Sequence, residues 1–277
     1  MRGLQFTKAQ AVGNDFLVVE SGELESLGLT LDDAPELAQE ICDIHTGVGA
    51  DGLEIVLPGE GAISAHLRIF NSDGSEAEIS GNGSRCVAAY LVEAGKVGEK
   101  FQLSTAAGTK TVQLLADRRP EFEFLMSMGI PTYREAELDA AVDLSDGSRR
   151  ATIVNVGNPQ CVLFVDDFDF DWRKQGDEIE SHSHFPARTN VSFVRVIDAK
   201  TIDVRFWERG AGETLSSGTG STGAAVAAIL TKRTGRRVEV RTPAGSMHLS
   251  WDDEIQLQGP ATLIAKGEYL LRQNSDG

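Results

Sequence analysis

The chain has 277 residues, which is enough for two domain cores of ordinary size. A composition of 41% hydrophobic and 25% charged residues is typical of a globular protein and excludes a disordered or fibrous chain. The formal net charge is −16, so nucleic acid and anionic membrane surfaces would repel the protein, and we discount both as partners.

The three cysteines, Cys42, Cys86 and Cys161, are scattered along the chain and show no CxxC spacing. This pattern argues against a disulfide framework and against a structural zinc site. The N-terminus carries no apolar signal segment, and no apolar run approaches the length of a membrane span. We therefore expect a cytoplasmic protein.

The first part of the chain predicts short strands and one early helix. Apolar residues at helical spacing predict that helix at 32–43, with Pro35 in its first turn. Gly108 stands between two alternating segments and predicts a hairpin turn. The predicted strands are 4–8, 16–20, 51–57, 66–70, 102–104 and 109–116.

The second part of the chain predicts a similar series. The strands are expected at 122–126, 152–156, 162–165, 190–196, 202–207, 238–242, 247–251 and 262–269. Residues 141–150 look like a loose polar loop. The last strand follows a completed second part, so we expect it to cross back to the first.

A stretch at residues 205–230 combines a strand end, a turn and an apolar helix. It reads RFWERGAGETLSSGTGSTGAAVAAIL, and its last part is small and apolar on every side. A helix that is apolar all round belongs in the interior of a domain. Its first turn would present free amide groups and the positive end of the helix dipole, which suit a carboxylate or a phosphate. Glu208 and Arg209 lie just upstream.

Residues 68–91 repeat this pattern 137 positions earlier. The segment RIFNSDGSEAEISGNGSRCVAAYL aligns with the later one without a gap, so that Ser80 corresponds to Ser217 and Gly81 to Gly218. Several matches in one order and at nearly one offset are typical of an internal duplication.

The duplication predicts two similar halves, each built around one buried helix and separated by a cleft. The first half is expected to span residues 1–120 and to be completed by the C-terminal strand 265–277. The second half is expected to span residues 121–264.

Other chemistries find less support. Residues 218–223 spell G-x-G-x-x-G, but ten residues separate this motif from the preceding strand, which is the wrong context for a dinucleotide site. His182 and His184 lie in a polar segment without a third metal ligand nearby. No G-x-S-x-G elbow indicates a Ser-His-Asp hydrolase.

The polar residues near the hinges have two interpretations. Each Ser-Gly-x-Gly hinge, taken alone, is explained as a helix N-cap, and each asparagine, taken alone, as a turn residue. Together they would suit a polar ligand that carries both ammonium and carboxylate groups. The asparagines are Asn14, Asn71, Asn82, Asn158 and Asn190.

These motifs together resemble the diaminopimelate epimerases, a family of pyridoxal-independent racemases and epimerases. The resemblance covers nearly the whole chain. It rests on GNDF at 13–16, NSDGSE at 71–76, GNGSRCVAA at 81–89, GNPQCV at 157–162, FPARTNVSFV at 185–194, WERGAGET at 207–214 and GTG at 218–220.

The resemblance implies an α/β (α+β) fold of two pseudo-symmetric domains. Each is a curved, mostly antiparallel sheet wrapped around a central apolar helix, with the substrate in the cleft at the two helix N-termini. It implies the inversion of LL-diaminopimelate to the meso form in lysine and peptidoglycan synthesis, with no metal or organic cofactor. The implied partner is the small amino-acid substrate, and a homodimer is compatible with the sequence.

The family chemistry also implies roles for single residues. One base removes the Cα proton from one face and one acid returns a proton to the other, and the family uses two cysteines for this. By resemblance Ser80 and Ser217 occupy these two positions, Glu208 lies beside them as a helper, and Gln160 stands where the family has an auxiliary histidine. The implied substrate-binding residues are Asn14, Asn71, Gly81, Asn82, Asn158, Asn190, Glu208, Arg209, Gly218 and Thr219.

The two serines depart from the family pattern at the reacting positions, because a serine hydroxyl is far too weak an acid to serve as a base alone. Three explanations stay open. The serines were introduced to trap a substrate complex, or the chain is a natural variant that uses serine with a neighbouring carboxylate such as Glu208. Alternatively, it keeps the binding site without epimerisation, as an amino-acid-binding protein or a different isomerase.

Overall fold

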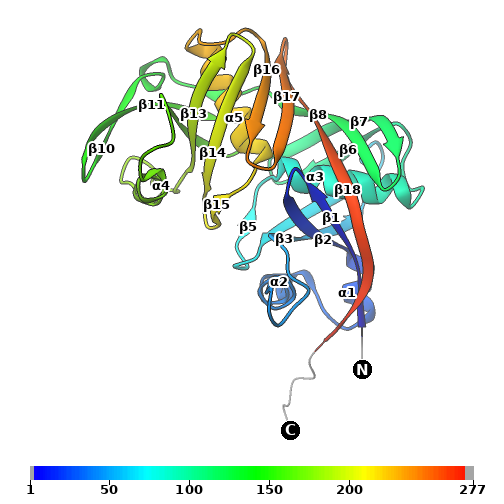
Figure 1. The fold of residues 1–277 in the computed structure, drawn as a ribbon. Helices are drawn as coiled ribbons and strands as arrows, with labels where there is room; N and C mark the ends of the chain where they lie inside the picture. The colour runs from blue at the N-terminus through cyan, green and yellow to red at the C-terminus, as the bar shows by residue number, and fades with distance from the viewer. Residues whose placement is uncertain (1–2, 272–277) are drawn as a thin grey trace.

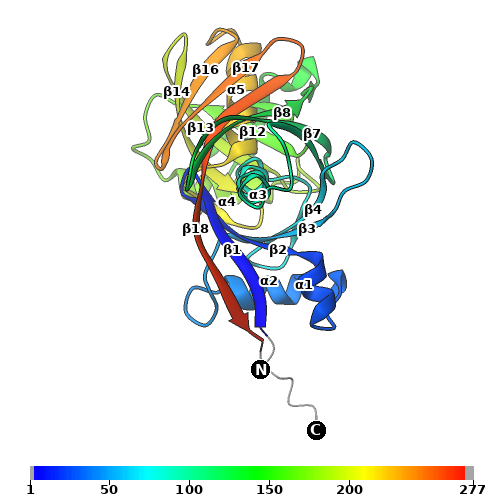
Figure 2. The ribbon, with the colours of Figure 1, turned by 90° about the vertical axis from the view of Figure 1, so that its right-hand side faces the viewer.

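The first half of the protein is a curved sheet around one helix. The computed structural model describes residues 3–271. Its elements in this half are β1 (Gly3–Ala11), β2 (Asn14–Glu20), α1 (Ser21–Ser26), a 3-10 turn (Leu31–Asp33), α2 (Ala34–Cys42), β3 (Gly52–Pro58), β4 (Ala65–Asn71), β5 (Glu76–Ala77), α3 (Gly81–Glu93), β6 (Lys100–Thr105), β7 (Gly108–Arg118) and β8 (Glu121–Gly129). Figure 2 looks along α3 and shows the strands curving around it.

The second half repeats this arrangement around α5, as Figure 1 shows. Its elements are β9 (Thr132–Tyr133), a 3-10 turn (Glu135–Glu137), β10 (Ala140–Leu144), β11 (Gly147–Asn155), β12 (Pro159–Phe164), α4 (Trp172–Glu180), β13 (Asn190–Asp198), β14 (Thr201–Glu208), β15 (Gly212–Thr214), α5 (Gly218–Leu230), β16 (Arg237–Thr242), β17 (Gly245–Trp251) and β18 (Ile255–Leu270).

Strand pairing follows the same pattern in both halves. In the first, β3 runs parallel to β2 and antiparallel to β4, and β6 is parallel to β4 and antiparallel to β7. In the second, β13 runs parallel to β12 and antiparallel to β14, and β16 is parallel to β14 and antiparallel to β17. The expected pseudo-symmetric α/β fold is therefore confirmed.

The two central helices are buried inside the curved sheets; the buried residues of α5 are nearly all small, whereas α3 also buries the large side chain of Arg85. Eleven residues of α3 and eleven of α5 are buried, and both helices contribute to one continuous apolar core. A second core lies between the outer face of β1–β3 and helices α1 and α2, and a third lies between β10–β13 and α4. Alanine and glycine allow the close backbone approach that a helix inside a curved sheet requires.

Strand β18 joins the halves. Its first part pairs with β17 and with β8, and its last part pairs with β1 from Leu270 opposite Gly3 onward. The expected return of this strand to the first half is thus seen up to Leu270. Residues 272–277 of the predicted terminal strand lie outside the described residues. Since β8 pairs with both β7 and β18, the division of the chain near residue 120 stays a prediction.

One prediction about local structure was wrong. Residues 141–150, interpreted as a loose loop, form the hairpin β10–β11. Ala140, Val142 and Leu144 are buried and alternate with exposed residues, because they cover one side of α4. Only residues 145 and 146 form the turn between the two strands, and the alternation in β10 is too short to stand out among the polar residues around it.

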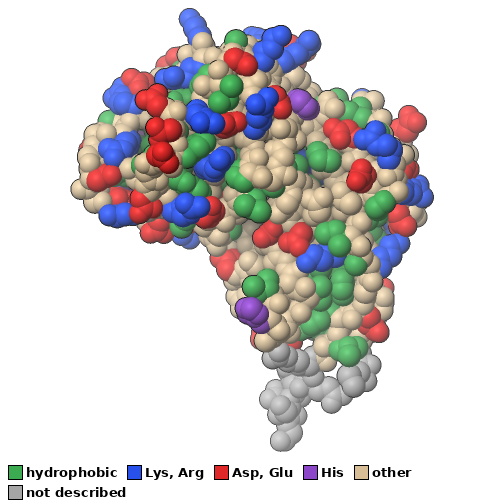
Figure 3. All heavy atoms as spheres, in the orientation of Figure 1, with side chains coloured by type: hydrophobic (Ala, Val, Ile, Leu, Met, Phe, Trp, Pro, Cys, Tyr) green, Lys and Arg blue, Asp and Glu red, His purple; other side chains and the backbone are tan. Residues whose placement is uncertain are grey.

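The surface seen in Figure 3 mixes acidic and basic side chains, and the molecule is notched between its two lobes. Across residues 3–271, none of the helices has the length and apolar character needed to cross a bilayer.

Candidate active site

The N-termini of α3 and α5 touch each other through glycine. A Cβ added to Gly218 would lie 2.7 Å from the Cα of Gly81 and 2.9 Å from the backbone nitrogen of Asn82. A Cβ added to Gly81 would lie 3.0 Å from the Cα of Gly218. Only glycine fits at this contact, so the sequence brings two positive helix ends to one point.

Each helix begins at a serine. Ser80 has extended backbone angles and its Oγ accepts the amide hydrogen of Gly83 at 3.0 Å, while Ser217 does the same with Gly220 at 3.0 Å. Both serines are therefore N-caps, as one interpretation predicted. The amides of the first two residues of each helix have no intrahelical acceptor, and they lie beside the two hydroxyls.

Glu208 supports one of the two serines. Its Oε2 accepts the hydroxyl hydrogen of Ser217 at 2.7 Å, and its Oε1 accepts that of Thr214 at 2.7 Å. Burial raises the pKa of Glu208 above the ordinary value of a glutamate, although the two hydroxyl hydrogen bonds act in the opposite direction. This carboxyl group therefore holds a proton at higher pH than a free glutamate does.

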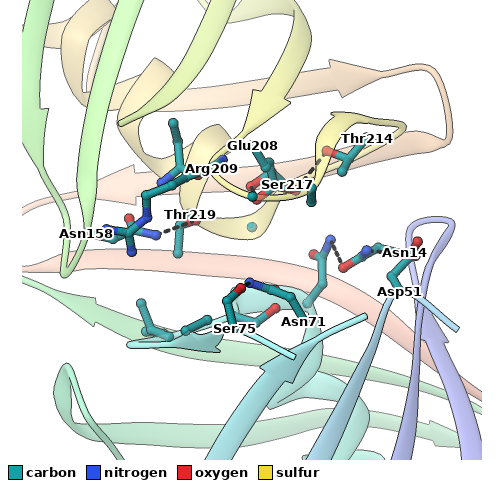
Figure 4. Close-up of a pocket in the computed structure, with 18 of the residues that line it drawn as sticks. Asn14, Asp51, Asn71, Ser75, Asn158, Glu208, Arg209, Thr214, Ser217 and Thr219 are labelled. Carbon is teal, nitrogen blue, oxygen red and sulfur yellow. Dashed lines mark hydrogen bonds between the residues drawn. The ribbon is translucent and has the colours of Figure 1, made fainter. Parts of the chain in front are cut away.

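A cleft of about 340 Å³ opens in front of the two helix ends. Figure 4 shows one wall carrying Glu208, Arg209, Ser217 and Thr219, and the opposite wall carrying Asn14, Asp51, Asn71 and Ser75. Its lining includes twelve of the thirteen residues that the sequence assigned to the site: Asn14, Asn71, Ser80, Gly81, Asn82, Asn158, Asn190, Glu208, Arg209, Ser217, Gly218 and Thr219.

Asparagines of the first half are held in place by hydrogen bonds. The amide of Asn14 donates to Asp51 Oδ2 at 2.8 Å, and burial raises the pKa of Asp51. Asn82 donates to the hydroxyl of Ser216 at 2.9 Å, which ties the start of α3 to the hinge before α5. Asn71 donates to Ser75 Oγ at 2.9 Å. These contacts fix polar groups at the cleft wall.

The thirteenth predicted residue, Gln160, does not reach the cleft. It is fully buried, packs against Gly223 of α5, and donates a hydrogen bond of 2.7 Å to Asn158 Oδ1. Asn158 in turn donates to Thr219 Oγ1 at 3.3 Å. Gln160 thus orients Asn158 from behind, and no direct contact with a bound molecule follows from its position.

Arg209 reaches from the second half to the first. Its guanidinium forms an ion pair with Glu78 on the opposite side of the cleft. Its backbone amide donates to Asn190 Oδ1 at 3.0 Å, so Asn190 positions the turn that carries it. The ion pair between Arg209 and Glu78 thus links the two halves at the edge of the cleft.

Several cleft residues were missed by the sequence interpretation. Asp51, Ser75, Glu78 and Thr214 line the cleft and hold predicted residues. Thr214 belongs to the motif WERGAGET and Ser75 to NSDGSE, so their place within a motif was the available signal. The two histidines have local contacts, since His182 bonds to the carbonyl of Asp143 and to the amide of His184.

The family model described as diaminopimelate epimerase matches this chain over residues 6–133 and 152–264. Among curated proteins, the diaminopimelate epimerase of Pelotomaculum thermopropionicum is 40% identical over 97% of this chain and 100% of its own length. That of a Synechocystis strain is 40% identical over 96% of this chain and 98% of its own length.

Solved structures of low identity share the fold. A probable proline racemase from Agrobacterium radiobacter has a TM-score of 0.79 at 17% identity, covering 99% of this chain and 94% of its own. A hydroxyproline epimerase from Agrobacterium vitis has a TM-score of 0.77 at 16% identity, with the same coverage. The family match, the 40% identity and the two helix ends that meet at the cleft agree, and this chain belongs to the diaminopimelate epimerase family.

Proposed function

We propose that this protein inverts one Cα of diaminopimelate, between the LL and meso forms, by proton transfer across the cleft. The observation that carries the proposal is the pair of serine hydroxyls at two helix N-termini in glycine contact. A Cα held between them would have one hydroxyl on each face. Inversion requires one group to remove a proton from one face and another to return it to the opposite face.

The helix ends supply the second requirement of the reaction. When the Cα proton leaves, negative charge moves onto the α-carboxylate. The free amides of Gly81, Asn82, Gly218 and Thr219 and two helix dipoles would stabilise that charge. The same groups would hold the carboxylate of the bound substrate before reaction.

The rim supports a substrate with a second amino-acid end. Arg209, which pairs with Glu78, lies where it could meet a distal carboxylate, and the acidic residues Asp51 and Asp73 offer partners for ammonium groups. A simple amino acid would leave these groups without a ligand contact. The names of the relatives agree with a diamino dicarboxylate substrate.

A serine needs help to accept a proton, and Glu208 provides it on one side. As Ser217 Oγ takes a proton from carbon, its own proton passes to Glu208 Oε2; in the opposite direction the protonated Glu208 returns it. The raised pKa of Glu208 suits both directions, because the carboxyl must be protonated in one and ionised in the other.

The second candidate is a binding protein without epimerase activity. Two observations favour it: among the residues that line the cleft, no carboxyl is hydrogen-bonded to Ser80, and Gln160 lies behind Asn158 with no ionisable group. The cytoplasmic location and a homodimer stay predictions.

The test is Cα–H exchange of LL-diaminopimelate in D₂O, followed by proton NMR, for the protein and for its Ser80→Cys/Ser217→Cys variant. We expect exchange by both, faster in the cysteine variant because a thiol at a helix N-terminus ionises by itself. Exchange by the cysteine variant alone would favour the binding protein. Exchange by neither would contradict the proposed substrate.

A further inference from the structure

A second buried carboxyl lies directly behind the other serine. Glu54 in strand β3 has no exposed surface, and neither of its oxygens has a hydrogen-bond partner among residues 3–271. Burying a carboxyl without hydrogen-bond partners costs free energy, because its desolvation is not compensated. Such a group in a folded protein therefore calls for an explanation. The desolvation raises its pKa to about 8.

Glu54 meets α3 at its first turn. A Cβ added to Gly83 would lie 1.7 Å from Glu54 Oε1 and 3.2 Å from the Cβ of Ser80. The amide of Gly83 also donates to Ser80 Oγ. Glu54 Oε1 thus occupies the place that a side chain at Gly83 would take, and the Cβ of Ser80 borders the same place.

The duplication shows that the first half lacks a carboxyl at the position equivalent to Glu208. At the offset of 137, Asn71 corresponds to Glu208, so the first half has an amide where the second has its carboxylate. Glu54 pairs with Ile69, and Ser192 pairs with Phe206, which is the equivalent of Ile69. Ser192 is thus the counterpart of Glu54.

The two halves therefore carry their carboxyl groups at different equivalent positions. The first half has the carboxyl of Glu54 and the neutral Asn71. The second half has the neutral Ser192 and the carboxyl of Glu208. The carboxyl of the second half contacts its serine from the cleft side, through the Ser217–Glu208 hydrogen bond. The carboxyl of the first half approaches its serine from the core. Both positions lie within one turn of a helix N-terminus.

We propose that Glu54 is a positioning residue that accepts the hydroxyl proton of Ser80 when Ser80 Oγ removes a proton from the substrate Cα. The inference rests on the proposed function of the cleft. A Cα–H bond breaks, the proton joins Ser80 Oγ, and the Ser80 proton forms an O–H bond on Glu54. The electron pair stays on the substrate, and a proton then returns to the opposite face from Ser217, which Glu208 resupplies.

Few other groups can influence this carboxyl. The residues paired with Glu54 are Val18 on β2 and Ile69 on β4, and both are apolar. On α3, burial and the charge of Glu54 keep the pKa of the Cys86 thiol well above its ordinary value, while the neighbouring Arg85 acts in the opposite direction. At neutral pH the thiol is therefore uncharged, and Glu54 is the group that titrates behind Ser80.

The test compares Glu54→Gln with the matched control Ser192→Ala, using the interconversion of LL- and meso-diaminopimelate across pH. We expect Glu54→Gln to lower kcat by about 10²-fold or more with little change in KM, since a positioned proton acceptor contributes that much. Its pH profile should lose a limb near pH 8. Ser192→Ala should keep the kcat of the unaltered protein.

A rescue separates proton transfer from folding. Glu54→Gln/Ser80→Cys should regain at least tenfold over Glu54→Gln, because a thiol ionises without a carboxyl behind it. A kcat of Glu54→Gln within threefold of the unaltered protein would overturn the inference, and so would a folded double variant that regains nothing. If the protein were inactive while Ser80→Cys/Ser217→Cys worked, the binding protein would be favoured, and the inference would fail together with the proposed epimerisation. Inactivity of both would contradict the proposed substrate as well. An active protein whose Glu54→Gln variant keeps its kcat would overturn the inference alone.

Discussion

The two halves share their backbone pattern and differ in what lies behind the first turn of the central helix. In the first half the open side of Gly83 faces the carboxyl of Glu54, and in the second the open side of Gly220 faces the ring of Phe206, with a Cβ there 2.7 Å from the ring. Ser217 is hydrogen-bonded to Glu208, whereas the equivalent carboxylate position near Ser80 is Asn71.

This difference shows which features the duplication keeps and which it leaves free. The glycine contact and the two serine caps are the same because both depend on backbone geometry. The position of the acidic group is different because a carboxyl can approach a serine either from the cleft or from the core. We infer that the site requires its two hydroxyls, those of Ser80 and Ser217, at equivalent positions. The carboxyl groups behind them, Glu54 and Glu208, can occupy positions that are not equivalent.

The largest effect is expected where the halves meet. Gly218→Ala should lower kcat at least about 100-fold. Its added Cβ would lie 2.7 Å from the Cα of Gly81 and would force the two helix ends apart. The two hydroxyls would then no longer be placed for proton transfer. Gly81→Ala should be milder, since its Cβ would lie 3.0 Å away. The measurement is steady-state kinetics of both variants.

The control is Gly22→Ala in α1, where an added Cβ has no neighbour within 4 Å. It should leave kcat unchanged. Equal kcat values for Gly218→Ala and Gly22→Ala would show that the helix contact is not needed for the reaction.

A second effect should appear in stability against pH. The pKa of Glu54 is raised from 4.5 to about 8 in the folded state, so the folded state binds this proton more tightly than the unfolded chain does. Stability from this group is complete below about pH 4.5 and is lost as the pH rises toward 8. Glu54→Leu removes this pH dependence, so its stability relative to the unaltered protein should rise by about 4 kcal/mol between pH 5 and pH 9.

Urea unfolding at pH 5 and pH 9 measures this difference. Ser192→Ala, which removes the counterpart of Glu54 and no titrating group, should show the same stability change at both pH values. A Glu54→Leu variant whose stability relative to the unaltered protein is independent of pH would contradict the raised pKa of Glu54 in the folded state.

The smallest effect concerns the rim. Glu78→Gln should change KM by about two- to fivefold with kcat kept, because the ion pair with Arg209 is partly solvated and such pairs contribute little. Asp139→Asn removes an exposed pair with Arg150 far from the cleft and serves as the control. A large fall in kcat for Glu78→Gln would mean that the rim takes part in closing the site.

Much of this architecture could be predicted from the sequence. The offset of 137 residues predicted two central helices with capped N-termini, because glycine, serine and small apolar residues leave few other structures possible. Twelve of thirteen predicted site residues line one cleft for the same reason. Each lies at a helix start or a strand end.

The remaining features depend on contacts between distant segments. Glu54 lies within the apolar run LEIVL, and a strand of this kind does not reveal which face meets a helix start. Gln160 shares a motif with Asn158 but lies inside β12, where it is buried against Gly223 of α5, whereas Asn158 lies in the bend before the strand and lines the cleft. The ion pair of Arg209 with Glu78 joins residues that only the folded halves bring together.

The most direct test of the account is isomer-resolved exchange by two single variants, Ser80→Ala and Ser217→Ala. Each is incubated in D₂O with LL- or with meso-diaminopimelate, and Cα deuterium is followed by proton NMR. If each half provides one proton-transfer group on one face, one variant should lose exchange of the LL isomer and keep that of the meso isomer, and the other should do the reverse. If both variants lost exchange of the same isomer, or if neither lost any exchange, a site built from two opposed halves would be contradicted.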